Sequence, residues 1–70
     1  GLEQMSTHLV IYDILGREVV TLVDRDLSPG RYSVVWTGVN RIGNRVASGV
    51  YFYSLRTGTF SDTRKMILLR

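Results

Sequence analysis

Turn-forming residues divide this chain into short runs that are rich in β-branched and aromatic side chains. Glycine, proline, asparagine or aspartate recurs at intervals of about ten residues, and the runs between them favour valine, isoleucine, threonine and tyrosine. No run combines a helical period with helix-capping residues. The pattern predicts an all-β fold class, in which several short antiparallel strands form a small β-sandwich.

The first part of the chain predicts a hairpin followed by a loop. A strand is expected over residues 7–12, and Gly16 can supply the positive φ that a short hairpin loop commonly needs. A second strand over 18–23 then folds back on the first. Residues 24–30 are predicted to form a polar loop that closes in a type II turn, with proline at its second position and Gly30 at its third.

Residues 31–37 alternate cleanly between two faces. Tyr32, Val34 and Trp36 share one face, and the residues between them share the other. The tryptophan marks the inner face. These three side chains are therefore predicted to lie in the core of the sandwich.

The remaining sequence predicts a loop and further strands. Residues 38–45 contain glycine and asparagine and are expected to form a loop, followed by a brief strand at 46–47. Residues 49–56 give the strongest strand signal in the chain. Residues 57–59 predict a hairpin turn into a last strand within 60–70.

Length and composition limit the chain to one small domain. Chains of 70 residues bury only about 60% of the surface that their unfolded form exposes, so little stability is left for strained or desolvated polar sites. The chain has no cysteine, and no apolar run reaches the roughly 18 residues that a membrane-spanning helix requires. Nine basic residues give a net charge of +3 but are dispersed along the chain, which argues against a nucleic-acid partner.

The polar residues do not assemble a recognisable catalytic or metal site. His8 is the single histidine, and the alternation places it opposite Leu9 and Ile11 as an exposed strand residue. Asp24 and Asp26 offer two carboxylates, whereas calcium prefers about six to eight oxygen ligands. We therefore expect no enzyme activity, no catalytic residue, no metal and no cofactor.

Tyr51 and Tyr53 share one face of their strand and allow two interpretations. If that face is open, the two rings form a platform on which sugars stack, as in a carbohydrate-binding module. If it is closed, both rings pack with Trp36 and Tyr32 in the core. We favour the core.

The end of the chain predicts a strand that is apolar on both faces. Met66, Ile67, Leu68 and Leu69 follow Lys65, whereas a two-layer sandwich normally leaves one face in water. Either a loop covers the outer face or a partner binds it. This segment is where we expect function to lie.

Four blocks of the sequence together resemble the C-terminal sorting domain of type IX secretion cargo. They span nearly the whole chain, and their order and spacing are more specific than any single block. The first three blocks also resemble the immunoglobulin-like domain of the flagellar hook-capping protein, and the fourth favours sorting. The blocks are residues 9–23, 29–36, 47–53 and 64–69.

The resemblance to the sorting domain implies a folded secretion signal, carried by residues 1–70 as the C-terminal domain of a larger exported protein. The implied fold is a small immunoglobulin-like antiparallel β-sandwich. The implied partners are the outer-membrane translocon and the upstream cargo domain, and the implied route runs through the periplasm to the cell surface or medium. The residues that match the translocon-recognition motif are Lys65, Met66, Ile67, Leu68 and Leu69, with Gly49 and Tyr51 in the preceding strand. The residues expected to hold the core and turns are Tyr32, Val34, Trp36, Gly16 and Gly30.

Two departures from the sorting family affect the expected fold. The family commonly has an aspartate after the tryptophan, where this chain has Thr37 and Gly38. The family also has an upstream strand, so we expect this chain to lack its first strand and any cleavage site to precede Gly1. Residues 9–12 would then expose an open sheet edge, through which the chain self-associates or borrows a strand.

Two functions of other classes stay open beside sorting. One is a structural immunoglobulin-like module of the hook-capping type or of an extracellular adhesin, and the other is a carbohydrate-binding module. The parent polypeptide would discriminate among them, because an exported hydrolase or adhesin indicates sorting and a flagellar context indicates the structural module.

Overall fold

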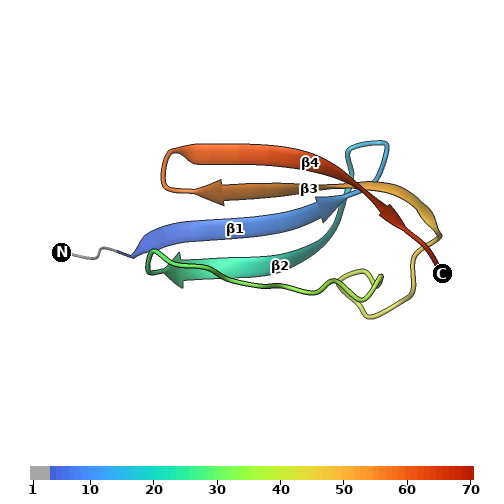
Figure 1. Ribbon diagram of the computed structural model, residues 1–70. Helices are drawn as coiled ribbons and strands as arrows, with labels where there is room; N and C mark the ends of the chain where they lie inside the picture. The colour runs from blue at the N-terminus through green and yellow to red at the C-terminus, as the bar shows by residue number, and fades with distance from the viewer. Residues whose placement is uncertain (1–3) are drawn as a thin grey trace.

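The computed structural model describes residues 4–70, which form a four-stranded antiparallel sheet and no helix. No helix among these residues therefore has the length and apolarity needed to cross a membrane. The spatial order of the strands is β2-β1-β3-β4 (Figure 1). Their bounds are β1 (Met5–Tyr12), β2 (Glu18–Leu27), β3 (Gly49–Thr57) and β4 (Phe60–Leu68). The all-β prediction is confirmed, and the single four-stranded antiparallel sheet is consistent with a small immunoglobulin-like fold.

The hairpin between β1 and β2 forms around an aspartate that caps its own turn. The Gly16 N–H donates to the Asp13 carbonyl at 3.0 Å, and Gly16 has a φ of 79°. The Asp13 Oδ1 accepts the N–H groups of Leu15 and Arg17, each at 2.9 Å. Aspartate favours such turns because its side chain can bond the backbone that follows it. Gly16 provides the left-handed conformation that this turn requires.

A second hairpin joins β3 to β4. Thr57 faces Phe60 in the ladder, so Gly58 and Thr59 form the loop between them, and Gly58 has a φ of 57°. The pairing then continues without a bulge to Gly49 opposite Leu68. The hairpin predicted at residues 57–59 is confirmed.

β1 is a central strand, so the expectation of an open edge along residues 9–12 is wrong. Ile11 faces Val20 on β2 and Tyr53 on β3. The free edges of the sheet within residues 4–70 belong to β2 and β4 instead. Pairing of the strands in chain order would leave β1 at an edge of the sheet. Instead, β3 pairs with β1 rather than with β2, after a long connection.

β2 is longer than predicted. Residues 24–27, which were expected in a loop, continue the strand, with Asp24 opposite His8 and Asp26 opposite Ser6. Charged side chains favour a loop in a sequence pattern, but here Asp24 and Asp26 lie on the face away from the groove and Arg25 is exposed near the end of the strand, so all three stay in water.

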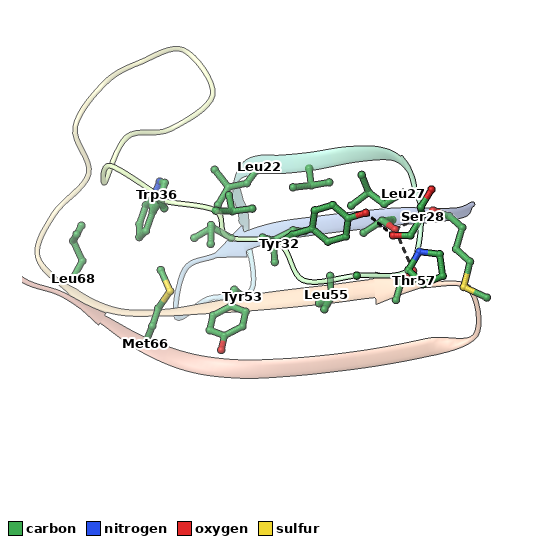
Figure 2. A pocket seen from close by; sticks show the side chains of 18 of the residues that line it. Leu22, Leu27, Ser28, Tyr32, Trp36, Tyr53, Leu55, Thr57, Met66 and Leu68 are labelled. Atoms are coloured by element: carbon green, nitrogen blue, oxygen red, sulfur yellow. Dashed lines mark hydrogen bonds between the residues drawn. The ribbon is translucent and has the colours of Figure 1, made fainter. Parts of the chain in front are cut away.

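The connection between β2 and β3 crosses one face of the sheet without joining a ladder (Figures 1 and 2). The expected strand over 31–37 is not formed, since its backbone makes no hydrogen bond to another described residue. Its alternation indicates an extended chain over an apolar face, but a strand also needs a neighbour to pair with. The brief strand expected at 46–47 is replaced by an isolated bridge between Val39 and Arg45.

The turn at Ser28, Pro29 and Gly30 is a bend rather than a type II turn. Gly30 has a φ of 157°, whereas the third position of a type II turn needs about 80°. The bend still reverses the chain, so that residues 31–37 return over the sheet.

The enclosed core is small. Val10, Ile11 and Tyr51 are the buried apolar side chains among the described residues, whereas Tyr32 and Val34 stay 54% and 44% exposed. The radius of gyration is 13.0 Å, against about 11 Å for a compact chain of this length. One sheet thus lies beneath a single extended segment, and the space between them is incompletely filled.

Candidate functional site

The main concave feature of the described residues is an apolar groove between the sheet and the connection that crosses it (Figure 2). Its volume is about 810 Å³. All four strands contribute side chains to its floor, and the crossing segment contributes its wall. Representative lining residues are Leu9, Val23, Leu55, Met66, Tyr32 and Val34.

The period of the strands explains why apolar side chains converge on this face. Met5, Thr7, Leu9 and Ile11 of β1 alternate onto it, and the register brings the corresponding residues of β3 beside them. On the crossing segment, Tyr32, Val34 and Trp36 face the same space, whereas Val35 is 79% exposed. The alternation predicted for residues 31–37 therefore describes the orientation of the side chains correctly, although no strand forms.

Trp36 closes one end of the groove. Its ring meets that of Tyr51 edge to face, with centroids 5.1 Å apart, and its Nε1–H donates to the Val39 carbonyl at 2.8 Å. The Tyr51 hydroxyl donates to the Ala47 carbonyl at 2.7 Å. Only 7% of Tyr51 is exposed, so an open tyrosine platform for sugars is excluded.

The other end of the groove lies at the bend after β2. The Tyr32 hydroxyl donates to the Ser28 carbonyl, and its ring lies over the sheet (Figure 2). Leu27, Pro29 and Met5 line this end. Tyr32 and Trp36 thus fix the two ends of the extended segment, while the backbone between them has no partner among the described residues.

Arg70 anchors the end of the chain to the loop that follows Trp36. Its Nε donates to the Val46 carbonyl at 2.6 Å, its guanidinium also donates to the Gly38 carbonyl, and its N–H donates to the Ser48 hydroxyl at 3.2 Å. Gly38 is buried and has a φ of 76°. No sequence pattern indicates this clamp, because the partners of the Arg70 guanidinium are backbone carbonyls, which any residue could supply.

Residues 65–68 of the predicted recognition motif lie on β4, at a free edge of the sheet, and Leu69 follows the strand. Gly49 and Tyr51 lie on the neighbouring β3. Met66 faces Tyr51, and Leu68 faces Gly49, so the two parts of the motif are neighbours in the sheet. Lys65 is exposed opposite Phe52. Ile67 and Leu69 are 63% and 84% exposed, so no described segment covers them. Recognition by a translocon stays a prediction.

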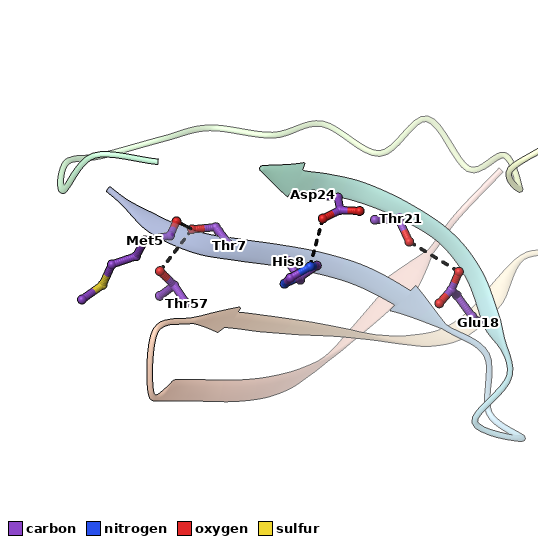
Figure 3. Close-up of polar contacts among 7 residues, drawn as sticks. All are labelled: Met5, Thr7, His8, Glu18, Thr21, Asp24 and Thr57. Atoms are coloured by element: carbon purple, nitrogen blue, oxygen red, sulfur yellow. Dashed lines mark hydrogen bonds and ion pairs between the residues drawn. The ribbon is translucent and has the colours of Figure 1, made fainter. Parts of the chain in front are cut away.

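The remaining polar side chains of the sheet form short pairwise contacts rather than a reactive cluster (Figure 3). The His8 Nε2 lies 2.9 Å from Asp24 Oδ1, across the strand pair. Thr7, buried on the groove face, has its hydroxyl 3.1 Å from that of Thr57. Within residues 4–70, no three histidine, aspartate or glutamate side chains are close enough to share a metal ion.

Comparison with known proteins identifies the family. The family model described as FlgD Ig-like domain matches residues 3–59. The chain belongs to the FlgD Ig-like domain family. This match covers both strands of the first hairpin, the crossing segment and β3, and residues 60–70 lie outside it.

No curated protein and no solved structure is significantly similar to this FlgD Ig-like chain. The family match supports the hook-capping resemblance and not the sorting resemblance. The three sequence blocks shared by both families all lie within residues 3–59, whereas the block that favoured sorting lies beyond them.

Proposed function

We propose that this chain is a structural immunoglobulin-like module of the flagellar hook-capping type, which acts by binding other proteins rather than by catalysis. The observation that supports this function most directly is the family match over residues 3–59. We further propose that the module works outside the cytoplasm, as part of an exported assembly.

The use of the polar side chains supports a structural role. His8 pairs with Asp24, and Asp13 accepts two backbone N–H groups of its own turn as well as the Arg17 guanidinium at 2.8 Å. Arg70 anchors two segments of backbone. Each of these groups stabilises the fold, and none of them faces the groove with a second reactive group beside it.

The distribution of apolar surface supports protein binding. The groove is lined mainly by apolar side chains, and a small domain leaves few such surfaces uncovered without a partner. Val35, Ile67 and Leu69 are also well exposed. Proteins recognise surfaces of this kind by burying them.

The proposal is tested by locating the tagged parent protein in the organism that makes it. A hook-capping type of module is expected to cosediment with purified hook and basal-body fractions and to stay there after a wash in high salt. An outer-membrane porin serves as the control for contamination. Recovery only from the outer membrane or the medium, with none in the hook fraction, would overturn the proposal in favour of a sorted cargo.

A further inference from the structure

The extended segment 31–37 has the geometry of a strand, but none of the strands within residues 4–70 pairs with it. At about 3.3 Å per residue it spans about 23 Å, and it runs along the groove over the face of the sheet (Figure 2). None of its backbone N–H or C=O groups bonds another described residue. Val35 points away from the groove while Val34 points into it, as successive strand residues do.

The groove beside this segment can hold the side chains that a paired strand would bring. A strand laid along 31–37 would direct every second side chain toward the sheet. There it would meet Leu9, Leu55 and Met66, which line the groove and are only half-buried. An added strand would therefore gain a backbone ladder and an apolar face together, which is the basis of peptide recognition by strand addition.

The charges at one end of the groove indicate which kind of strand fits. Arg25 faces Thr7 in the ladder, so it projects from β2 on the groove face, two residues before Leu27. Arg31 follows Gly30, which also lines the groove. Both arginines are exposed, and neither forms an ion pair with another described residue. A strand with a carboxylate at this end would complement them.

The same charges disfavour pairing between the 31–37 segments of two copies of this chain. Its own 31–37 segment contains one arginine and no acidic residue. Pairing two such segments would bring no carboxylate to Arg25 or Arg31. A strand of another sequence, with a carboxylate at this end, complements the two arginines better than a second 31–37 segment does.

We propose that the groove and the unpaired backbone of residues 31–37 accept an extended segment of another polypeptide, with alternate apolar side chains and an acidic residue at the end near Arg25 and Arg31. This inference rests on the proposed function of a protein-binding module and names the class of segment that it binds. The added strand would begin a second sheet over the first, the two layers lying about 10 Å apart.

The test uses a synthetic nine-residue probe, in which valine and threonine alternate over seven residues between two terminal glutamates. Binding to the 70-residue chain is followed by titration and by hydrogen exchange of the backbone amides. We expect saturable binding, with new protection of amides within 32–36. The same peptide N-methylated at every interior residue is more apolar but lacks the N–H donors, and we expect it not to bind.

Charge reversal tests the predicted role of the two arginines without disturbing the core. Arg25→Glu and Arg31→Glu are each expected to weaken binding of the glutamate-ended probe about two- to fivefold, the range of an exposed ion pair. Both should strengthen binding of a lysine-ended probe. Arg41→Glu, an exposed change in the distant loop, is the matched control and should alter neither affinity by more than the experimental error.

Four outcomes would overturn the proposal: no binding of the probe, equal binding of the N-methylated peptide, protection confined to the free edge of β4, or a peptide-independent dimer that protects residues 32–36. The last result would show that a second copy occupies the site. Peptide binding is measured independently of hook association, so a failure here is distinct from a failure of the proposed function.

Discussion

The ring of Trp36 meets the ring of Tyr51 edge to face, with centroids 5.1 Å apart and planes inclined by 70°. This contact joins the crossing segment to β3 at one end of the groove. Edge-to-face pairs of this kind contribute about 0.5–1.5 kcal/mol beyond the area that they bury. Trp36 also bonds Val39, so it links the sheet to the loop that follows it.

Replacing Trp36 by alanine is therefore expected to destabilise the chain severely. The cost should be about 3 kcal/mol, at the low end of the range for tryptophan truncation because the ring is half-buried. This approaches the total of about 4–10 kcal/mol available to a domain of this size. Trp36→Phe keeps an aromatic edge but loses the bond to Val39, and should cost about 1 kcal/mol. Urea unfolding followed by circular dichroism measures the stability of both variants. An unshifted transition for Trp36→Ala would show that the contact between Trp36 and Tyr51 does not hold the crossing segment on the sheet.

The clamp made by Arg70 is expected to stabilise the loop between residues 38 and 48. Arg70→Ala should lower the free energy of unfolding by about 1–2 kcal/mol, because it removes two hydrogen bonds from a charged donor at an exposed site. Arg41→Ala is the matched control and should change stability by less than about 0.5 kcal/mol. If the backbone amide of Val46 exchanges faster in Arg70→Ala but not in Arg41→Ala, the loss of stability lies in this loop. Equal stability of the two variants would show that the clamp contributes nothing in solution.

Gly16 and Gly38, two of the glycines with a positive φ, should respond differently to replacement by alanine. A Cβ at Gly38 would lie 2.7 Å from an Arg70 nitrogen, whereas a Cβ at Gly16 would meet no atom within 4 Å. Both positions carry the strain of a positive φ, which costs about 1–3 kcal/mol for other residues. Gly38→Ala should therefore lower the melting temperature more than Gly16→Ala. The reverse order would mean that Arg70 does not lie against Gly38.

The charge of Asp13 should give the hairpin a dependence on pH. The Arg17 backbone N–H, and then the other bonds to this carboxylate, lower the pKa of Asp13 from its usual 3.8. A carboxyl whose pKa is lower in the folded state stabilises the fold above its unfolded pKa, and this contribution is lost as the pH falls through the folded pKa. We therefore expect the melting temperature of the wild-type chain to decrease when the pH is lowered below about 4.

Asp13→Asn is the matched variant for this effect. Asparagine can accept the same two backbone bonds, as Asn40 does from Ile42 and Asn44 at 3.2 and 3.0 Å. The variant should therefore keep the turn and show a smaller loss of melting temperature between pH 5 and pH 3. An identical acid profile in both chains would assign the pH dependence to other groups.

The sequence predicted the parts of the fold that depend on local chemistry. The hairpins at Gly16 and Gly58 follow from turn residues between β-type runs, and the inward orientation of Trp36 follows from the alternation of its segment. Pairing could not be predicted in the same way. The alternation of residues 31–37 indicates an extended chain whether or not a neighbouring strand is present, and β3 pairs with β1 across a long connection that no local pattern specifies.

The candidate site was only partly visible in the sequence. The apolar character of residues 31–37 and of β4 indicated surfaces that something must cover, but the groove depends on the order of the strands. The clamp of Arg70 could not be anticipated, because side-chain bonds to distant carbonyls leave no periodic signal. The block at residues 64–69 favoured the resemblance to the sorting domain, whereas the match to the FlgD Ig-like domain is confined to residues 3–59.

The most direct test of a structural module against a secretion signal is a pair of reporter fusions. Residues 1–70, and the same chain without residues 65–70, are each fused behind a periplasmic reporter in a cell that has the type IX translocon. A proven sorting domain serves as the positive control, and circular dichroism of the purified domains checks that both fold. A structural module predicts that both fusions stay in the periplasm. The contradicting result would be that the fusion with residues 1–70 is released from the cell, and that removal of residues 65–70 abolishes this release although the shortened domain still folds.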